Sequence, residues 1–286
     1  MTDQAEGLRR LLGRDFVRIV TLTSSREGVG KTTAALNLAA ALANAGKSVM
    51  ILDENPGRGN LAGMLRRDAQ GDILDVARLG RPLEEVMLKG VDGVAILQAS
   101  RGVQALAELD ETEQQRLIDC MGNIAKPVDV VLVDTAAGSP GHLLSLSLDS
   151  QEIAVVLSAE GSAVTDAYAL IKMMNLQYGK RHFRILVNKV KSEEEGRAVF
   201  ESMSAVARRF LAVTLDYMGY VPDDEALRRA FNLGRIAVEA FPLSRAGSNF
   251  RQIADSVIRW PCSQQMDLGD FLNRLIQGSR LSAARA

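Results

Sequence analysis

Apolar, β-branched runs alternate with helix-like segments along most of the chain. Several of the runs are apolar almost throughout, as strands buried on both faces are. The strand candidates are Val17–Thr23, Ser48–Asp53, Gly93–Ala99, Val128–Asp134, Glu152–Ser158, Phe183–Val190 and a weaker Ala212–Tyr220. Helical patterns lie between them, among them Lys31–Ala45, Glu113–Met121, Val164–Gln177 and Glu194–Phe210.

This alternation predicts an α/β fold, doubly wound, with a mostly parallel sheet and helices on both faces. We expect a short N-terminal arm over residues 1–15, a main domain over 16–262 and an amphipathic tail over 263–286. The N-terminus lacks the apolar segment of a signal peptide, and no apolar run is long enough to span a bilayer. These features predict a cytoplasmic protein.

Composition excludes a disordered or collagen-like chain, because 47% of the 286 residues are hydrophobic. A net charge of −1 gives no overall attraction to nucleic acid. From Arg228 onward, however, the sequence has nine arginines, no lysines and four acidic residues, an excess of five positive charges. That excess fits either a solvated helical face or a surface for an anionic membrane or nucleic acid.

Both ends of the chain have apolar residues at helical spacing. In the tail, Leu268, Phe271, Leu272, Leu275 and Ile276 fall on one face, which fits a membrane-surface helix or a helix packed on the domain. The arm is too short to be a stable helix alone. It is either a frayed end or a segment that folds onto a partner.

The sequence GVGKTT (28–33) follows the first predicted strand and opens a long helix, which is the context of a phosphate-binding loop. Glycines let backbone N–H groups close around phosphate oxygens, and the helix N-terminus adds partial positive charge. Lys31 can reach the β- and γ-phosphates, and Thr32 can offer its hydroxyl to Mg²⁺. The residues expected in this loop are Gly28, Val29, Gly30, Lys31, Thr32 and Thr33.

Polar residues at other strand ends support this site. Asp134 ends a buried strand, where it can hold Mg²⁺ through water, and Gly138 can turn a backbone N–H toward the γ-phosphate. Asn188 also ends a strand, at the sheet edge where ligands collect in α/β folds.

Together these segments resemble the MinD/ParA-type ATPases, P-loop proteins with the deviant loop K-G-G-x-G-K-[ST]. Ile51–Leu61 is similar to the family's first switch, whose core is D-x-D, and "VDTAAG" is similar to its second. "LVNKV" and Met218–Ala230 resemble the two segments beside the adenine. The resemblance implies ATP and Mg²⁺ as cofactors, with Asn188 and Pro222 at the base and Thr32, Asp53 and Asp134 at the metal.

Two further segments resemble one subfamily, the flagellar-number regulators called FlhG or FleN. They are the arm Asp3–Leu11, similar to D-Q-A-x-x-L-R, and Ser158–Lys172, similar to a segment ending T-D-A-Y-A-L-I-K. The resemblance implies an ATP-dependent homodimer that acts on an FlhF-like signal-recognition-type GTPase, a flagellar transcription regulator and C-ring proteins. It favours peripheral, polar membrane association through the tail. The arm residues matched to the GTPase contact are Asp3, Gln4, Ala5, Leu8 and Arg9.

Three positions depart from the family pattern. Arg26 replaces the signature lysine that reaches a partner's ATP, and Glu27 replaces a loop glycine. Asn55 replaces the aspartate that positions the attacking water and has no negative charge to polarise it. We therefore expect ATP binding with slow or absent hydrolysis. A working ATPase, a nucleotide-free scaffold and a DNA-binding partition protein are the alternatives.

Overall fold

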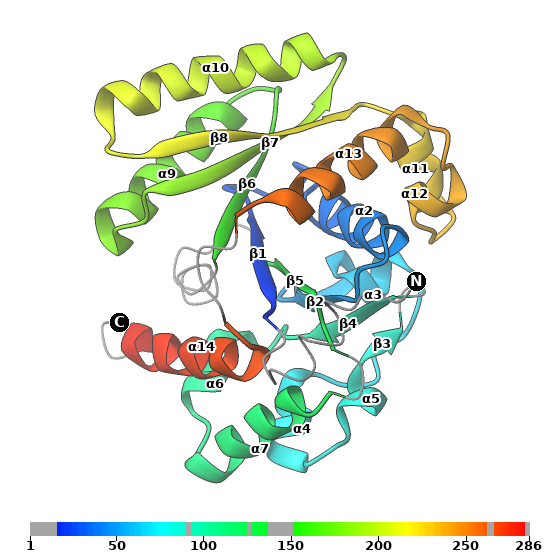
Figure 1. The fold of residues 1–286 in the computed structure, drawn as a ribbon, viewed down its shortest axis with the longest axis vertical. Coiled ribbons are helices and arrows are strands. Elements are labelled where there is room, and N and C mark those ends of the chain that lie inside the picture. Colours follow the sequence, from blue (N-terminus) through cyan, green and yellow to red (C-terminus); the bar gives the residue numbers. More distant parts are fainter. Residues whose placement is uncertain (1–15, 90–92, 125–126, 137–150, 262–265, 284–286) are drawn as a thin grey trace, which may run out of the picture.

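In the computed structural model, the described residues are 16–89, 93–124, 127–136, 151–261 and 266–283. Their strands form one eight-stranded sheet in the order β3-β4-β2-β5-β1-β6-β7-β8 (Figure 1). The strands are β1 (Arg18–Thr23), β2 (Val49–Asp53), β3 (Leu88–Lys89), β4 (Val94–Gln98), β5 (Val130–Asp134), β6 (Glu152–Ser158), β7 (His182–Val190) and β8 (Thr214–Pro222). All neighbours pair in parallel except β3, which is antiparallel to β4 at the edge.

Helices connect these strands and cover both faces of the sheet. They are α2 (Lys31–Asn44), α3 (Leu61–Met64), α4 (Ile73–Leu79), α5 (Leu83–Val86), α6 (Gly102–Ala107), α7 (Glu111–Gly122), α9 (Ala163–Tyr178), α10 (Glu193–Phe210), α11 (Glu225–Asn232), α12 (Ala237–Ala240), α13 (Arg245–Arg259) and α14 (Leu268–Ala283), with a 3₁₀ turn at Gly57–Gly59. The predicted doubly wound, mostly parallel α/β fold is thus confirmed.

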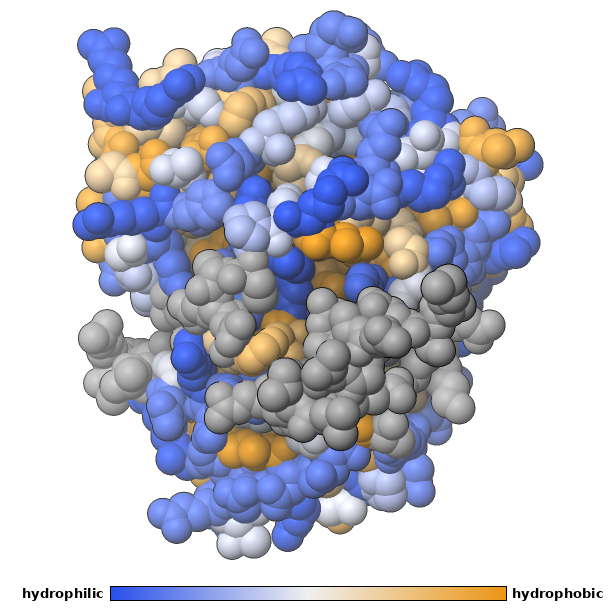
Figure 2. All heavy atoms as spheres, in the orientation of Figure 1, coloured by the Kyte–Doolittle hydropathy of each residue, from blue (hydrophilic) through white to orange (hydrophobic). Residues whose placement is uncertain are grey.

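Alternate residues of the central strands enter different cores, which explains their apolar runs. Val49 and Ile51 of β2 join the core under α2 and α13, whereas Met50 and Leu52 join the core under α4, α7 and α14. A third core lies between β6, β7 and the helices α9 and α10. Figure 2 shows mostly hydrophilic side chains on the outward side of α10, whose exposed large apolar residues are Val206 and Phe210. In parallel strands buried on both faces, both side-chain sets must be apolar.

Helix α14 is part of the domain core. Four of its apolar residues are each at most 1% exposed: Phe271, Leu272, Leu275 and Ile276. Just before it, the carbonyl of Met266 accepts a hydrogen bond from the N–H of Val17 at 2.9 Å. The sequence fitted either a membrane-surface helix or a helix packed on the domain. In the structure, α14 packs on the domain. Among the described helices, none combines the length and hydropathy needed to cross a membrane.

Candidate functional site

The turn between β1 and α2 has the backbone of a phosphate-binding loop. Gly28 and Gly30 adopt φ values of 77° and 88°, a region that L-residues with a side chain rarely enter. A Cβ atom on Gly30 would lie 2.2 Å from Nδ2 of Asn188, so a larger residue would collide with it. The loop leads directly into α2, whose first N–H groups lack partners within the helix.

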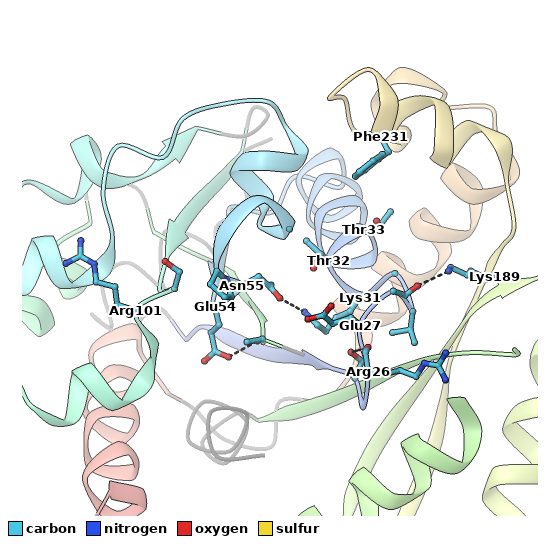
Figure 3. A pocket seen from close by; sticks show the side chains of 18 residues that line it. Arg26, Glu27, Lys31, Thr32, Thr33, Glu54, Asn55, Arg101, Lys189 and Phe231 are labelled. Carbon is cyan, nitrogen blue, oxygen red and sulfur yellow. Dashed lines mark hydrogen bonds between the residues drawn. The ribbon is translucent and has the colours of Figure 1, made fainter. Parts of the chain in front are cut away.

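This loop forms one wall of a cavity of about 920 Å³. Figure 3 shows side chains from the loop, from the segment after β2, from the turn after β4 and from α11 around it. Of the residues predicted for the site, those that line it are Arg26, Gly28, Val29, Gly30, Lys31, Thr32, Thr33 and Asn55. Glu27, the other departure from the family loop, also lines it and is exposed. Gly138 and the predicted partner residues Asp3, Gln4, Ala5, Leu8 and Arg9 lie outside the described residues.

Lys31 forms a buried ion pair with Asp134, the aspartate at the end of β5. The side chains are 4% and 0% exposed. Asn55 completes the arrangement: its Nδ2 donates to Asp134 at 2.7 Å, and its Oδ1 lies 3.5 Å from Nζ of Lys31. In this conformation, the Asp134 carboxylate neutralises the positive charge of Lys31, to which a phosphate would otherwise bind.

Asp53, at the end of β2, is held from two sides. Oδ1 accepts hydrogen bonds from the backbone and side chain of Asn55 at 3.0 and 2.9 Å, and Oδ2 accepts one from the N–H of Leu61 at 2.6 Å. Burial and the nearby charge of Asp134 raise the pKa of Asp53 to about 6, against these hydrogen bonds. Asn55 therefore joins the carboxylates of Asp53 and Asp134, which would otherwise repel each other.

Glu54 is a buried carboxyl group in the cavity wall that the sequence analysis did not identify. It is 5% exposed, its Oε2 accepts a hydrogen bond from the N–H of Ala136 at 3.3 Å, and its Oε1 has no hydrogen-bond partner among the described residues. Burial raises the pKa of Glu54 to about 8, while the Ala136 N–H and the charge of Lys31 oppose the shift. Glu54 thus connects the segment after β2 to the segment after β5.

Arg26 points away from Lys31, toward the start of α9 (Figure 3). Its Nη1 donates to Ser162 Oγ at 3.0 Å and lies 3.4 Å from Oδ2 of Asp166. The side chains of Arg26 and Asp166 are 46% and 40% exposed. Solvent therefore screens this ion pair and makes it weak, so Arg26 can be released at little cost.

Asn188 holds the backbone of the phosphate loop by a hydrogen bond. Its Nδ2 donates to the carbonyl of Val29 at 2.7 Å, and its Oδ1 accepts from the N–H of Lys189 at 2.9 Å. Both polar atoms predicted for adenine thus have protein partners. Pro222, at the end of β8, is buried and is outside the set of cavity-lining residues.

Other residues that sequence reasoning missed complete the cavity. Arg101, in the turn after β4, forms an ion pair with Asp75 at 2.8 Å, and Phe231, at the end of α11, is 55% exposed at the cavity rim. Lys189 contacts the phosphate loop, where its Nζ donates a hydrogen bond to the carbonyl of Gly28. Two of the missed residues lay inside segments already recognised in the sequence: Lys189 in LVNKV, beside Asn188, and Glu54 between Asp53 and Asn55.

The donor groups fit a nucleotide with Mg²⁺. Glycines with positive φ at a helix N-terminus leave backbone N–H groups for phosphate oxygens. Thr32 and the carboxylates of Asp53 and Asp134 have oxygen donors of the kind that Mg²⁺ prefers, and these residues would hold the ion directly or through water.

Residues 20–237 match the family described as CobQ/CobB/MinD/ParA nucleotide binding domain. The chain is 38% identical over 263 residues to the antiactivator FleN of Pseudomonas aeruginosa, covering 91% of this chain and 94% of that protein. It is 26% identical over 243 residues to the flagellum site-determining protein YlxH of Helicobacter pylori, covering 84% and 82%. The septum site-determining protein MinD of Pyrococcus horikoshii, solved with Mg-ADP, has a TM-score of 0.62 at 22% identity, covering 85% and 96% of the two chains.

Proposed function

Because this chain belongs to the CobQ/CobB/MinD/ParA family of nucleotide-binding domains, we propose that it binds ATP with Mg²⁺ in the cavity beside the phosphate loop. The nucleotide acts as a switch in the control of flagellar number and placement. The names of two relatives, an antiactivator and a flagellum site-determining protein, support this role.

The observation that carries the nucleotide proposal is the position of Lys31. It opens α2 after two glycines with positive φ and lines the cavity. Its ammonium group is held by Asp134, at the end of β5, and by Asn55, two residues after the end of β2, so that it contacts one residue of each switch segment. When the β- and γ-phosphates bind, Lys31 exchanges these partners for phosphate oxygens. Asp134 and Asn55, no longer bound to Lys31, can then change position, and the segments after β5 and β2 move with them.

Hydrolysis is slow in this proposal. Asn55 stands where the family pattern has a water-positioning aspartate, and its amide is bound to Asp53 and Asp134. A neutral amide in that place does not take a proton from water. ATP therefore persists and acts through the conformation it stabilises.

The ATP-bound form is a homodimer in this proposal. Arg26 is exposed beside the cavity, and its two contacts, a hydrogen bond to Ser162 and the ion pair with Asp166, are both solvent-exposed and weak. It is therefore free to reach a phosphate bound by a second copy. Guanidinium is well suited to such a contact. Thr32, Asp53 and Asp134 hold Mg²⁺ in each copy.

The proposed partners are an FlhF-like GTPase, a flagellar transcription regulator and C-ring proteins. The protein is cytoplasmic, with peripheral and polar membrane association. Because the apolar face of α14 is buried, membrane binding through this helix requires its release from the core. Two released helices in a dimer would bind a membrane far better than one.

Calorimetry and sedimentation test the proposal. The parent protein is expected to bind Mg-ATP and to form dimers with it, whereas Lys31→Ala loses both properties. Arg26→Ala is expected to bind ATP but remain monomeric, and Asp166→Asn, which removes the ion pair with Arg26, dimerises at least as well as the parent. A parent protein that binds no ATP overturns the proposal and leaves a nucleotide-free scaffold. ATP-dependent binding to random duplex DNA would favour a partition protein instead.

A further inference from the structure

Lys189 lies where strand β7 departs from regular pairing. The register of β7 with β8 shifts between Asn188 and Val190, so Lys189 is the extra residue of a bulge. Its φ is 58°, in the left-handed region that side-chain-bearing residues seldom adopt. Bulges and unfavourable backbone angles beside a binding site commonly serve to aim a side chain.

The bulge aims Lys189 at the phosphate loop. Its Nζ donates to the carbonyl oxygen of Gly28 at 2.8 Å, as Figure 3 shows. The adjacent Asn188 donates to the carbonyl of Val29, the next one along the loop. Two neighbouring side chains at one strand end therefore hold two successive loop carbonyls.

Holding these carbonyls also orients the loop's N–H groups. In a trans peptide, the C=O and the following N–H point in opposite directions. The Lys189 contact therefore fixes the direction of the Val29 N–H, and the Asn188 contact fixes that of the Gly30 N–H. The ammonium group also adds positive charge at the rim of the cavity that it lines.

We propose that Lys189 is a positioning residue for polyphosphate binding: it holds the Gly28 peptide so that the Val29 N–H is already directed when the phosphates arrive. The inference rests on the proposed function, because the polyphosphate is that of ATP.

Four variants test this role. Lys189→Met keeps the stem but loses the donor, Lys189→Arg keeps a donor, and Lys189→Gly loses the donor but accepts a positive φ without cost. Lys191→Met is the matched control, since Lys191 is exposed two positions away and is not among the cavity-lining residues. The measurements are ATP affinity by calorimetry, and hydrogen exchange of the phosphate-loop amides without nucleotide.

Lys189→Met is expected to bind ATP about fivefold more weakly, as for one solvent-exposed charge-assisted hydrogen bond, and its loop amides exchange faster. Lys189→Arg restores most of the affinity. Lys189→Gly binds as weakly as Lys189→Met although its melting temperature does not fall below that of Lys189→Met, which separates positioning from stability. If Lys189→Met matches Lys191→Met in both measurements, the inference is overturned. If the parent binds no ATP, the proposed function fails, while unchanged loop exchange in Lys189→Met would separately overturn the positioning role.

Discussion

Lys31 and Asp134 form an ion pair in which both side chains are almost completely removed from solvent. Two charges buried together are stable only while each has its partner, because an isolated buried charge loses its hydration without compensation. The pair therefore couples the stability of the free protein to the residue proposed to bind phosphate.

Lys31→Met is expected to lower the free energy of unfolding by about 3–5 kcal/mol, because it leaves the Asp134 carboxylate buried without a cation. The double variant Lys31→Met/Asp134→Asn should be more stable than Lys31→Met, since it removes the orphaned charge. Urea unfolding measures both, with Lys191→Met as the exposed-lysine control. Equal stability of the single and double variants would show that Asp134 is not left uncompensated.

Asn55→Asp is expected to raise the rate of phosphate release, because it restores a carboxylate near the attacking water. In the free protein it also places a third negative charge between Asp53 and Asp134, replacing the hydrogen bonds that Asn55 donates to both. We therefore expect it to lose about 1–3 kcal/mol of stability without nucleotide. Phosphate-release assays and thermal unfolding check the two effects. A parent protein that already hydrolyses ATP as fast as Asn55→Asp contradicts the proposed slow hydrolysis.

Because the pKa of Glu54 is raised in the folded protein, we expect the free energy of unfolding to fall as the pH rises. Its pKa is raised from the ordinary 4.5 to about 8 in the folded protein, so between these values the folded state holds a proton that the unfolded state has released. Stability then falls with rising pH, by at most about 1.4 kcal/mol per pH unit for one group. Asp53 contributes the same sign only up to about pH 6, its folded pKa.

Glu54→Gln isolates this effect. Between about pH 6 and pH 8, the free energy of unfolding should fall with pH in the parent and fall less in the variant. Urea unfolding at a series of pH values gives the slopes. Parallel slopes would mean that Glu54 is already ionised in the folded protein at neutral pH.

Leu272 tests the role of α14. Because its side chain is fully buried, Leu272→Ala should cost about 2–5 kcal/mol, whereas Gln277→Ala, at an exposed position of the same helix, should change stability by less than about 0.5 kcal/mol. Liposome pelleting of the same two variants adds a second measurement. If membrane binding requires release of α14, the destabilised Leu272→Ala should pellet at least as well as Gln277→Ala. An unchanged unfolding energy for Leu272→Ala would show that the helix is already free.

The strands and the phosphate loop could be predicted because their causes are local. Apolar runs such as Val130–Asp134 are required by burial on both faces, and GVGKTT has the glycines that its turn demands. The side of α14 that is covered could not be predicted, because the same amphipathic spacing suits a membrane and a core. The two-residue strand Leu88–Lys89 is too short to show a period.

Glu54 and Lys189 depend on tertiary context. A carboxylate one position beyond a strand gives no periodic signal, and its burial follows only when the segment after β5 lies against it. Nothing in the sequence indicates that a lysine adopts a φ of 58°, since lysine has no local preference for that region. In both cases, contacts between segments far apart in the chain decide the conformation.

The packing of α14 also has a consequence for the order of assembly during synthesis. One core contains Val17 and Ile19 as well as Phe271 and Ile276, so it cannot close on the ribosome until residue 276 has emerged. The core between β6, β7, α9 and α10 draws its buried members from residues 153–203 and can form much earlier. We therefore expect a nascent intermediate in which one face of β6 and β7 is covered while the rest of the sheet remains a substrate for chaperones.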